Sequence, residues 1–409
     1  MSTLRHTSIA ATGLAGLLAL SGAGLGHATA AATSTPALQV PDNAVITIDG
    51  RGFGHGHGLS QYGAEGAARQ GLSARKILHF YYPGTRSGQQ SGRVRVLITA
   101  GIGKPTIVLA GPGLKVHDLQ KGTTTPVPTR GPAARATQWR MAGDGAGGTA
   151  VSYRTGAWHV WRTLPGNGEF RSARAALTLV VGGSRTSYRG TLQSLAPVSK
   201  ATHRITVNRV SLEGYVRGVV PREMPTSWHQ AALQAQAVAA RTYAAFEAVN
   251  PYDTRFNLCD TSSCQVYGGL SAENPRTGKA VTRTAGQVRL FHGQPAFTQF
   301  SSSNGGWTSD GGQPYLSAEK DPYDGWPGNL VHTWSTAVTS RSIEKAFPGV
   351  GNLRSIAVTQ RDGNGQWGGR VEVMNLRGSK RNLVVSGDDF RSALGLRSTW
   401  FDLAKAAAG

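Results

Sequence analysis

Three features that are scarce in this sequence limit what the protein can be. Acidic residues are few, with 22 Asp and Glu against 43 Lys and Arg among 409 residues, so the formal net charge is +21 and an acidic solvating protein is excluded. Only two cysteines are present, and a zinc site built on them would need two further ligands. After residue 30 no apolar run approaches the roughly 20 residues that a membrane span needs.

Glycine and proline are abundant instead. The chain contains 55 Gly and 19 Pro, which favour many short strands and turns over a long helical bundle and exclude a coiled coil. With 39% apolar residues the chain can bury a substantial core, and its length allows two or three lobes.

The N-terminal segment 1–30 has the pattern of a secretory signal peptide. Arg5 and His6 precede an apolar run at 9–25, and His-Ala-Thr-Ala at 27–30 has the small residues of a cleavage site. A retained membrane anchor is the alternative. Segment 31–44 is rich in Ala, Thr and Pro and predicts a linker. We therefore expect a secreted protein without a stable membrane span, whose positive charge attracts it to a polyanion such as a cell-wall polymer.

The order of apolar and polar residues predicts many strands and few helices. Residues 93–200 consist of alternating runs separated by Gly and Pro, which indicates a mostly β region. Ser227 and Gln230 have the spacing of a capping box, so a helix should run from about 228 to 249. The other elements expected are a strand at 45–48, a helix at about 60–70 and a hairpin at 288–291 and 296–300.

A glycine-rich run, Gly-Arg-Gly-Phe-Gly-His-Gly-His-Gly, occupies 50–58 between that strand and that helix. It lacks the third glycine of a dinucleotide-binding loop. Its glycines would let the backbone approach a ligand closely, and a metal site at its two histidines would lack further ligands nearby in sequence. A tight structural turn is the alternative. The residues that offer hydrogen bonds here are His55, Ser60, Gln61 and Tyr62.

Glu223 is the most unusual carboxylate of the chain. It lies between Pro221 and Pro225, directly before the long helix, so its position is rigid. An acid that protonates a leaving oxygen needs such placement and a pKa raised by apolar surroundings. Arg222 would lower that pKa if it faced the carboxylate. Glu223 is thus either a general acid or an ordinary surface glutamate.

Two further groups of polar side chains are candidates for ligand binding. Gln236 and Arg241 lie on the predicted helix and suit sugar hydroxyls or an anion, although a solvated helix face explains the pattern as well. Ser302 and Ser303 lie in a Ser/Gly loop at 301–306. No Gly-x-Ser-x-Gly motif surrounds them, so ligand hydrogen bonding suits them better than nucleophilic catalysis.

Cys259 and Cys264 stand five residues apart. In an exported chain such a pair predicts a disulfide. No histidine lies between His229 and His292 to complete a zinc site, and we expect neither a metal ion nor another cofactor.

Several stretches together resemble one family, the stage II sporulation protein D (SpoIID/LytB) family of cell-wall proteins. The segment Leu-Glu-Gly-Tyr-Val-Arg-Gly-Val-Val-Pro-Arg-Glu-Met-Pro at 212–225 is similar to the family segment that bears the catalytic glutamate. The other matching stretches are Ala-Gln-Ala-Val-Ala-Ala-Arg-Thr-Tyr-Ala at 235–244, Cys-Asp-Thr-Ser-Ser-Cys-Gln-Val-Tyr-Gly-Gly at 259–269, the Ser/Gly loop at 300–306 and the C-terminal motif at 390–398. The resemblance covers about 45–90 and 93–402.

The order of the motifs differs from that of the family. The blocks at 54–64 and 77–84 stand near the N-terminus, whereas relatives place their equivalents after the C-terminal motif. This indicates a circular permutation, which is tolerated where the termini lie close together. The expected plan is a signal peptide at 1–30, a linker at 31–44, the permuted segment at 45–90, a β-rich region at 91–200, a catalytic core at 201–402 and a tail at 403–409.

The resemblance implies an α+β, β-rich fold with a few helices, in which the Glu223 segment, the following helix and the permuted glycine loop form one cleft. It also implies a lytic transglycosylase that cuts the MurNAc–GlcNAc bond of peptidoglycan and leaves 1,6-anhydroMurNAc ends, with Glu223 as the single acid and base. No second acid adjoins Glu223, although Asp260 or Asp310 would serve if folding brought either close. The residues expected to bind the glycan are Gln236, Arg241, Ser302, Ser303, His55, Ser60, Gln61 and Tyr62.

A non-catalytic role is the alternative, because some members of the family enhance a wall amidase instead of acting as enzymes. Ser263 stands where relatives often have a histidine, which argues against a carried-over zinc site. Nucleic-acid binding is not expected, because the basic residues are dispersed and not clustered with aromatics in a known module. The expected partners are peptidoglycan glycan strands and a wall amidase, at the cell wall.

Overall fold

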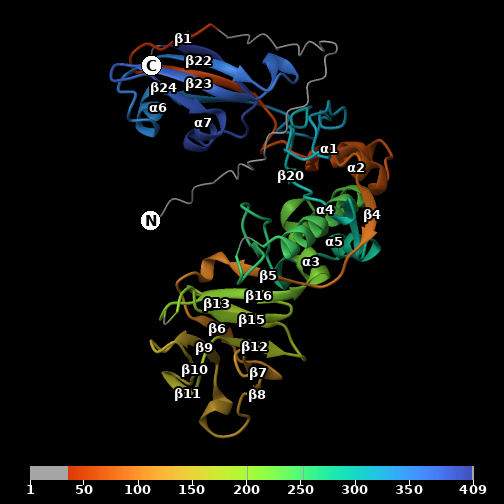
Figure 1. Cartoon of the computed structure of the whole chain (residues 1–409), viewed down its shortest axis with the longest axis vertical. Coiled ribbons are helices and arrows are strands. Elements are labelled where there is room, and N and C mark those ends of the chain that lie inside the picture. Colours follow the sequence, from red (N-terminus) through yellow and green to blue (C-terminus); the bar gives the residue numbers. More distant parts are fainter. Residues whose placement is uncertain (1–35, 200, 252, 408–409) are drawn as a thin grey trace, which may run out of the picture.

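The structure is a computed structural model that describes residues 36–199, 201–251 and 253–407. Figure 1 shows three parts arranged along the long axis, with a larger β lobe at one end, a helical part in the middle and a smaller β lobe at the other end. This confirms the α+β, β-rich fold expected from the sequence. The predicted signal peptide lies outside the described residues.

The larger β lobe consists of two mostly antiparallel sheets, whose strands alternate buried and exposed positions around a shared core. One sheet has the order β17 (Leu258–Cys259), β5 (Arg93–Ile98), β16 (Ile205–Ser211), β15 (Thr191–Leu195), β12 (Gly168–Ser172), β7 (Leu114–Asp118) and β8 (Thr124–Pro126). The other has the order β11 (Trp158–Leu164), β10 (Thr149–Arg154), β9 (Gln138–Gly143), β6 (Thr106–Leu109), β13 (Leu177–Val181) and β14 (Ser184–Tyr188). Because β16 and β17 belong to the first sheet, the boundary expected at residue 200 divides a continuous sheet.

The helical part is built around α4 (Gln230–Val249), which packs against the other helices of this part and against β18. Alanines occupy most of its buried positions, and their small side chains let neighbouring elements approach closely. The surrounding elements are α1 (Gln61–Arg69), α2 (Ala74–Tyr81), α3 (Leu212–Glu223), α5 (Pro275–Arg283), β4 (Arg86–Gln89), β18 (Gln287–Phe291) and β19 (Gln294–Pro295).

The start of α4 differs from the prediction. The helix begins at Gln230 with His229 as its N-cap residue, and no side-chain cap from Ser227 forms. Instead, the backbone N–H of His229 donates to the buried carboxylate of Glu65, at 2.8 Å. A residue of α1 therefore does what the predicted capping box would have done, and the two helices are linked at this end.

The smaller β lobe has a separate hydrophobic core that includes Ile46, Ile356 and Phe390. It contains the sheet β1 (Leu38–Gln39), β22 (Leu353–Arg361), β23 (Val371–Gly378) and β24 (Leu383–Ser386), the sheet β21 (Thr333–Thr339), β2 (Val45–Arg51) and β25 (Phe401–Ala407), and the helices α6 (Ser340–Ala346) and α7 (Gly387–Leu394). Leu38–Gln39 pairs with β22, so this part of the expected linker is a strand, because its side chains reach the core of the lobe.

A strand near each end of the described chain belongs to the smaller lobe, and the two strands pair with each other. β2 and β25 are antiparallel neighbours, and Val45, where β2 begins, lies opposite Ala407, where β25 ends. From β2 the chain runs through the glycine loop into β3 (Leu59–Ser60), which pairs in parallel with β20 (Phe300–Ser301). The hairpin expected at 288–291 and 296–300 is therefore wrong in its second strand, since β18 pairs with β19 instead.

Four short 3-10 helices complete the described elements, at Thr99–Gly101, Pro132–Arg135, Leu270–Ala272 and Gln366–Gly368. In the part of the chain that the structure describes, no helix combines the length and apolar character needed to cross a membrane.

Candidate functional site

Glu223 is the last residue of α3, and its carboxylate is held by two N–H donors from distant segments. Oε1 accepts a hydrogen bond from the backbone N–H of Val266 at 2.7 Å. Oε2 accepts one from Nε2 of Gln61 at 3.2 Å. Val266 lies just beyond the cysteine loop and Gln61 is the first residue of α1. Three separate parts of the sequence thus meet at one carboxylate.

Burial raises the pKa of Glu223 above its ordinary value. The hydrogen bonds from Val266 and Gln61 and the charge of Arg222 act in the opposite direction, but burial has the largest effect. Arg222 is exposed, so water screens its charge. The balance that the sequence left open therefore favours a carboxyl group that holds its proton to higher pH, as a general acid requires. None of the groups that act on this pKa is a second acid.

A cavity of about 700 Å³ lies beside the Glu223 segment. Pro221, Arg222 and Val266 line one side of it, and residues of the larger β lobe line another. This volume is within the range of about 300–1,000 Å³ that is usual for ligand sites. Asp260 also lines the cavity, where it accepts a hydrogen bond from the backbone N–H of Thr99 at 3.0 Å.

The glycine loop places the start of α1, and hence Gln61, against Glu223. Gly58 has a φ of +60°, and a Cβ there would lie 2.3 Å from the carbonyl oxygen of Gln299, so only glycine fits. The backbone N–H of Tyr62 then donates to the carbonyl of half-buried Ser302 at 2.9 Å. The glycine loop and the Ser/Gly loop are therefore packed against each other, and together they orient the first turn of α1.

Ser60 and Ser303, expected to bind glycan, are buried and bind Asp324 instead. The Ser60 hydroxyl donates to Asp324 Oδ1 at 2.6 Å and caps α1 by accepting from Gly63 N–H. The Ser303 hydroxyl donates to Asp324 Oδ2 at 2.8 Å. His332 Nδ1 lies 2.8 Å from the same oxygen. The roles of both serines are thus corrected to holding the two loops together, because their hydroxyls face the interior. The sequence around Asp324 did not predict that its carboxylate would bind Ser60, Ser303 and His332.

His55 is also better explained as a structural residue of the glycine loop. Burial lowers its pKa to about 3, with further lowering by the neighbouring charges of His57 and Arg370, so the imidazole is neutral. One ring nitrogen bonds to the backbone of Phe300, and Nδ1 accepts from the N–H of His57 at 2.9 Å. Both nitrogens of this expected glycan-binding residue are thus occupied within the protein. Asp310 acts on His57 in this region and not on Glu223.

Arg241 is fully buried and does not face a cavity. Its Nε and Nη2 bind the carboxylate of Glu213 at 2.7 and 2.9 Å, and Nη1 donates to the carbonyls of Ala237 and Gln287. The expected glycan-binding role is corrected to a link between α3, α4 and β18. Gln236 is fully buried as well, and neither polar atom of its side chain has a hydrogen-bond partner among the described residues.

Tyr62 remains a candidate for sugar contact and has aromatic neighbours that sequence reasoning missed. Its ring centroid lies 4.9 Å from that of Trp228 and 6.2 Å from that of Trp326. Tyr62 and Trp326 are half-buried, whereas Trp228 is buried. Aromatic faces of this kind are suited to pack against a ligand while a polar edge stays wet. Tyr62 follows Gln61 directly at the start of α1, so this aromatic group belongs to the same helix turn as the residue that bonds to Glu223.

A disulfide joins Cys259 and Cys264, with 5.5 Å between their Cα atoms. The loop that it closes leads directly to Val266, whose N–H holds Glu223. Within the described ranges, no three His, Cys, Asp or Glu side chains cluster closely enough to hold a metal ion.

Comparison with known proteins connects this site to a family. Residues 200–291, which include Glu223, the cysteine loop and all of α4, match the family model described as "Stage II sporulation protein". A "Stage II sporulation protein D" from Bacillus amyloliquefaciens is 29% identical over 232 residues, which are 51% of this chain and 65% of that protein. The part of the chain that holds Glu223 is therefore similar to the SpoIID/LytB family.

Two further relatives are similar to parts of the chain. An "Amidase enhancer" from Bacillus subtilis (strain 168) is 40% identical over 139 residues, which are 32% of this chain and 19% of that protein. A "Stage II sporulation protein D" from the same strain is 29% identical over 235 residues, again 51% of this chain and 65% of the relative. The match to each of these relatives spans less than two thirds of that relative's length.

Proposed function

We propose that this protein is a lytic transglycosylase that cleaves the MurNAc–GlcNAc bond in the glycan strands of peptidoglycan during cell-wall remodelling. The observation that carries the proposal is the environment of Glu223. The Glu223 carboxyl group is half-buried, has a raised pKa and is held from two sides, and its neighbours Arg222 and Val266 line a cavity of about 700 Å³.

In the first step, the Glu223 carboxyl group donates its proton to the glycosidic oxygen. The bond from that oxygen to C1 of the MurNAc unit breaks, the GlcNAc unit leaves with a new hydroxyl, and positive charge develops at C1. Oε2 is the oxygen suited to carry the proton, because its contact with Gln61 at 3.2 Å is longer than the 2.7 Å contact of Oε1 with Val266. The Val266 N–H stabilises the carboxylate that remains.

In the second step, the Glu223 carboxylate accepts the proton of the 6-hydroxyl of the same MurNAc unit. The freed oxygen attacks C1 and closes the 1,6-anhydro ring, and Glu223 is protonated again. Atoms and charges balance without water, and one residue acts first as acid and then as base. An intramolecular hydroxyl is already in place, which removes the entropy cost of bringing a nucleophile to C1.

Among the described residues, no second acid is one of the groups that shift the pKa of Glu223. This supports a lytic transglycosylase reaction over hydrolysis. Glycoside hydrolases normally pair two carboxyl groups about 5–9.5 Å apart, one to protonate the leaving oxygen and one to activate water or form a covalent intermediate. Two acids line the neighbouring cavity. Asp260 accepts a hydrogen bond from the backbone N–H of Thr99, and Glu273 is paired with Arg189.

The similarity to SpoIID/LytB proteins supports a role at the cell wall. We propose further that the protein is secreted and retained there, since a formal charge of +21 favours anionic wall polymers.

A second function, a non-catalytic enhancer of a wall amidase, is favoured by a different observation. One relative, 40% identical over 139 residues, is named an amidase enhancer. In that case the cavity would bind glycan without cutting it, and Glu223 would serve binding of the glycan or of the amidase.

The deciding experiment is mass spectrometry of purified glycan strands incubated with the full chain, on strands with and without stem peptides. We expect new 1,6-anhydroMurNAc ends from the wild type and none from Glu223→Gln, while the variant keeps its affinity for glycan. Glu319→Gln, an exposed glutamate, is the matched control and should retain activity. Reducing ends in place of anhydro ends would indicate a hydrolase. Stimulation of an added amidase without any cleavage by the wild type would favour the enhancer.

A further inference from the structure

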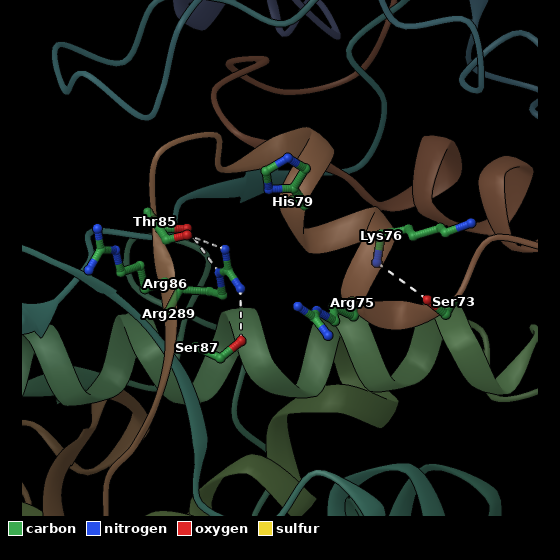
Figure 2. Close-up of a pocket in the computed structure, with 8 residues that line it drawn as sticks. All are labelled: Ser73, Arg75, Lys76, His79, Thr85, Arg86, Ser87 and Arg289. Carbon is green, nitrogen blue, oxygen red and sulfur yellow. Dashed lines mark hydrogen bonds between the residues drawn. The ribbon is translucent and has the colours of Figure 1, made fainter.

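A second cavity, of about 720 Å³, lies in the helical part between α2, β4 and β18 (Figure 2). It shares no lining residue with the cavity beside Glu223. Its lining is unusual in composition, because every side chain is either basic or carries a hydroxyl group, and none is acidic. The basic residues are Arg75, Lys76, His79, Arg86 and Arg289.

Arg289 forms the buried part of this cavity and is only 4% exposed. Its guanidinium donates to the hydroxyl of Thr85 at 2.9 Å, to the carbonyl of Thr85 at 2.5 Å and to the hydroxyl of Ser87 at 3.1 Å. All three acceptors are neutral. A guanidinium has five N–H donors, so one on Nη1 and one on Nη2 have no acceptor among the described residues.

Among the described residues, no carboxylate forms an ion pair with the basic side chains of this cavity. In Figure 2, Arg75 extends from α2 toward Arg289, Arg86 lies on the other side, and Lys76 points away. Burial lowers the pKa of Arg289, and the charge of Arg75 lowers it further. Two like charges thus face one cavity, an arrangement that a bound anion would stabilise.

We propose that this cavity binds the phosphate group of a phosphodiester-linked polymer. Guanidinium groups match phosphate oxygens in geometry as well as in charge. Arg289 supplies donors at the base, exposed Arg75 and Arg86 supply charge at the rim, and the hydroxyls of Ser73 and Ser87 supply further hydrogen bonds. The volume is large enough to hold the units on either side of the phosphate. The site would fix the protein on an anionic polymer, separately from the Glu223 cavity.

The test is isothermal titration of the full chain in phosphate-free buffer with three probes at equal ionic strength. The probes are inorganic phosphate, poly(glycerol phosphate) and polyglutamate of matched charge. We expect poly(glycerol phosphate) to bind, and the double variant Arg75→Ala with Arg86→Ala to weaken that binding at least tenfold. Both residues are exposed, so the variant should fold. Arg289→Gln should also lose binding, with its fold checked by circular dichroism.

The matched control is Arg354→Ala with Arg377→Ala, which removes the same charge from exposed positions of the smaller lobe. It should keep the affinity within twofold. Two results would overturn the proposal in favour of general charge attraction. One is an equal loss of poly(glycerol phosphate) affinity in this control. The other is that polyglutamate binds with the same affinity as poly(glycerol phosphate) and loses it to the same extent when Arg75 and Arg86 are replaced. Absence of poly(glycerol phosphate) binding would also overturn it. Binding of inorganic phosphate that depends on Arg75 and Arg86 would support a site for the phosphate group itself, whereas polymer binding alone would support a site that needs the diester.

This inference does not rest on the proposed reaction. Glu223→Gln should bind poly(glycerol phosphate) as the wild type does, because Glu223 does not line the cavity. Failure of glycan cleavage and failure of phosphate binding are therefore distinguishable.

Discussion

Gln61 donates a hydrogen bond to Glu223 across 162 residues of sequence, from the first residue of α1 to the last residue of α3. The donor is placed by the glycine loop and the acceptor by a proline-bounded helix end. This contact is what joins the two segments into one site, and it makes Gln61 a positioning residue for the Glu223 carboxyl group.

Replacing Gln61 should therefore alter the pH dependence of glycan cleavage. The Gln61 hydrogen bond lowers the pKa of Glu223, so Gln61→Leu should move the titration of Glu223 in the pH–rate profile to higher pH. Loss of a hydrogen bond to a charged group costs about 1.5–3 kcal/mol, and we expect kcat to fall about tenfold or more. Gln70→Leu, at an exposed position just beyond α1, is the control. An unchanged pH profile for Gln61→Leu would contradict the positioning role.

The raised pKa of Glu223 also predicts how stability depends on pH. An acid whose pKa is raised by folding stabilises the folded state below its unfolded pKa, and that contribution is lost as the pH rises through the folded value. Glu223→Gln removes the charge, so its melting temperature should equal or exceed that of the wild type at neutral pH, and the advantage should shrink on acidification.

Asp253 provides a control of opposite sign, because Arg255 lowers its pKa. Its contribution is present above the unfolded pKa and is lost as the pH falls, so Asp253→Asn should reduce stability at neutral pH and not in acid. Differential scanning calorimetry at several pH values measures both. A lower melting temperature for Glu223→Gln at neutral pH would show that its hydrogen bonds outweigh the cost of burying its charge.

Arg241 should prove important for stability and not for glycan binding. Removing one member of a buried ion pair costs about 3–5 kcal/mol, and Arg241→Met leaves Glu213 without its partner. Because Glu213 is 36% exposed, we expect the low end, about 3 kcal/mol. Urea denaturation measures the loss, and the double variant with Glu213→Gln should recover part of it. A large rise in KM with unchanged stability would restore the glycan-binding role.

The adjacency of Val45 and Ala407 makes the proposed permutation testable. Because β25 ends where β2 begins, a two-residue Asn-Gly turn should connect them as a hairpin. New ends fit between Gln90 and Gly92, where Ser91 and Gly92 are exposed and the chain passes from β4 to β5. The connection omits β1 and the buried Val40, so we expect this permutant to fold with a lower melting temperature than the wild type and to keep its activity.

A permutant opened between Val238 and Ala239, in the buried centre of α4, is the control and should not fold. If the first permutant also fails while the wild-type order folds, the glycine loop depends on its present connection and the permutation hypothesis loses its support.

The sequence alone determined the features that depend on near neighbours in the chain. The glycine-rich run at 50–58 predicted a loop, and the residues after it predicted a helix that starts at about residue 60. The helix α1 begins at Gln61, one residue after the predicted start, because the Ser60 hydroxyl caps it. Glu223 was singled out because Pro221 and Pro225 flank it, and the cysteine pair because Cys259 and Cys264 stand only five positions apart. These inferences rest on backbone geometry and local hydrogen bonds, which short stretches of sequence encode.

Only the tertiary structure decided what each polar side chain faces. Ser303 and Arg241 looked like ligand-binding residues, but Asp324 and Glu213 occupy their donors from 21 and 28 residues away. The local sequence did not predict three features of the structure. These are the hydrogen bond from the N–H of Val266, the aromatic neighbours of Tyr62 and the unpaired charge of Arg289. The burial of a side chain and its charged partners depend on segments that folding brings together. Burial and charged partners in turn determine the pKa and the hydrogen bonds of each side chain. The chemistry of the site therefore depends on the tertiary structure.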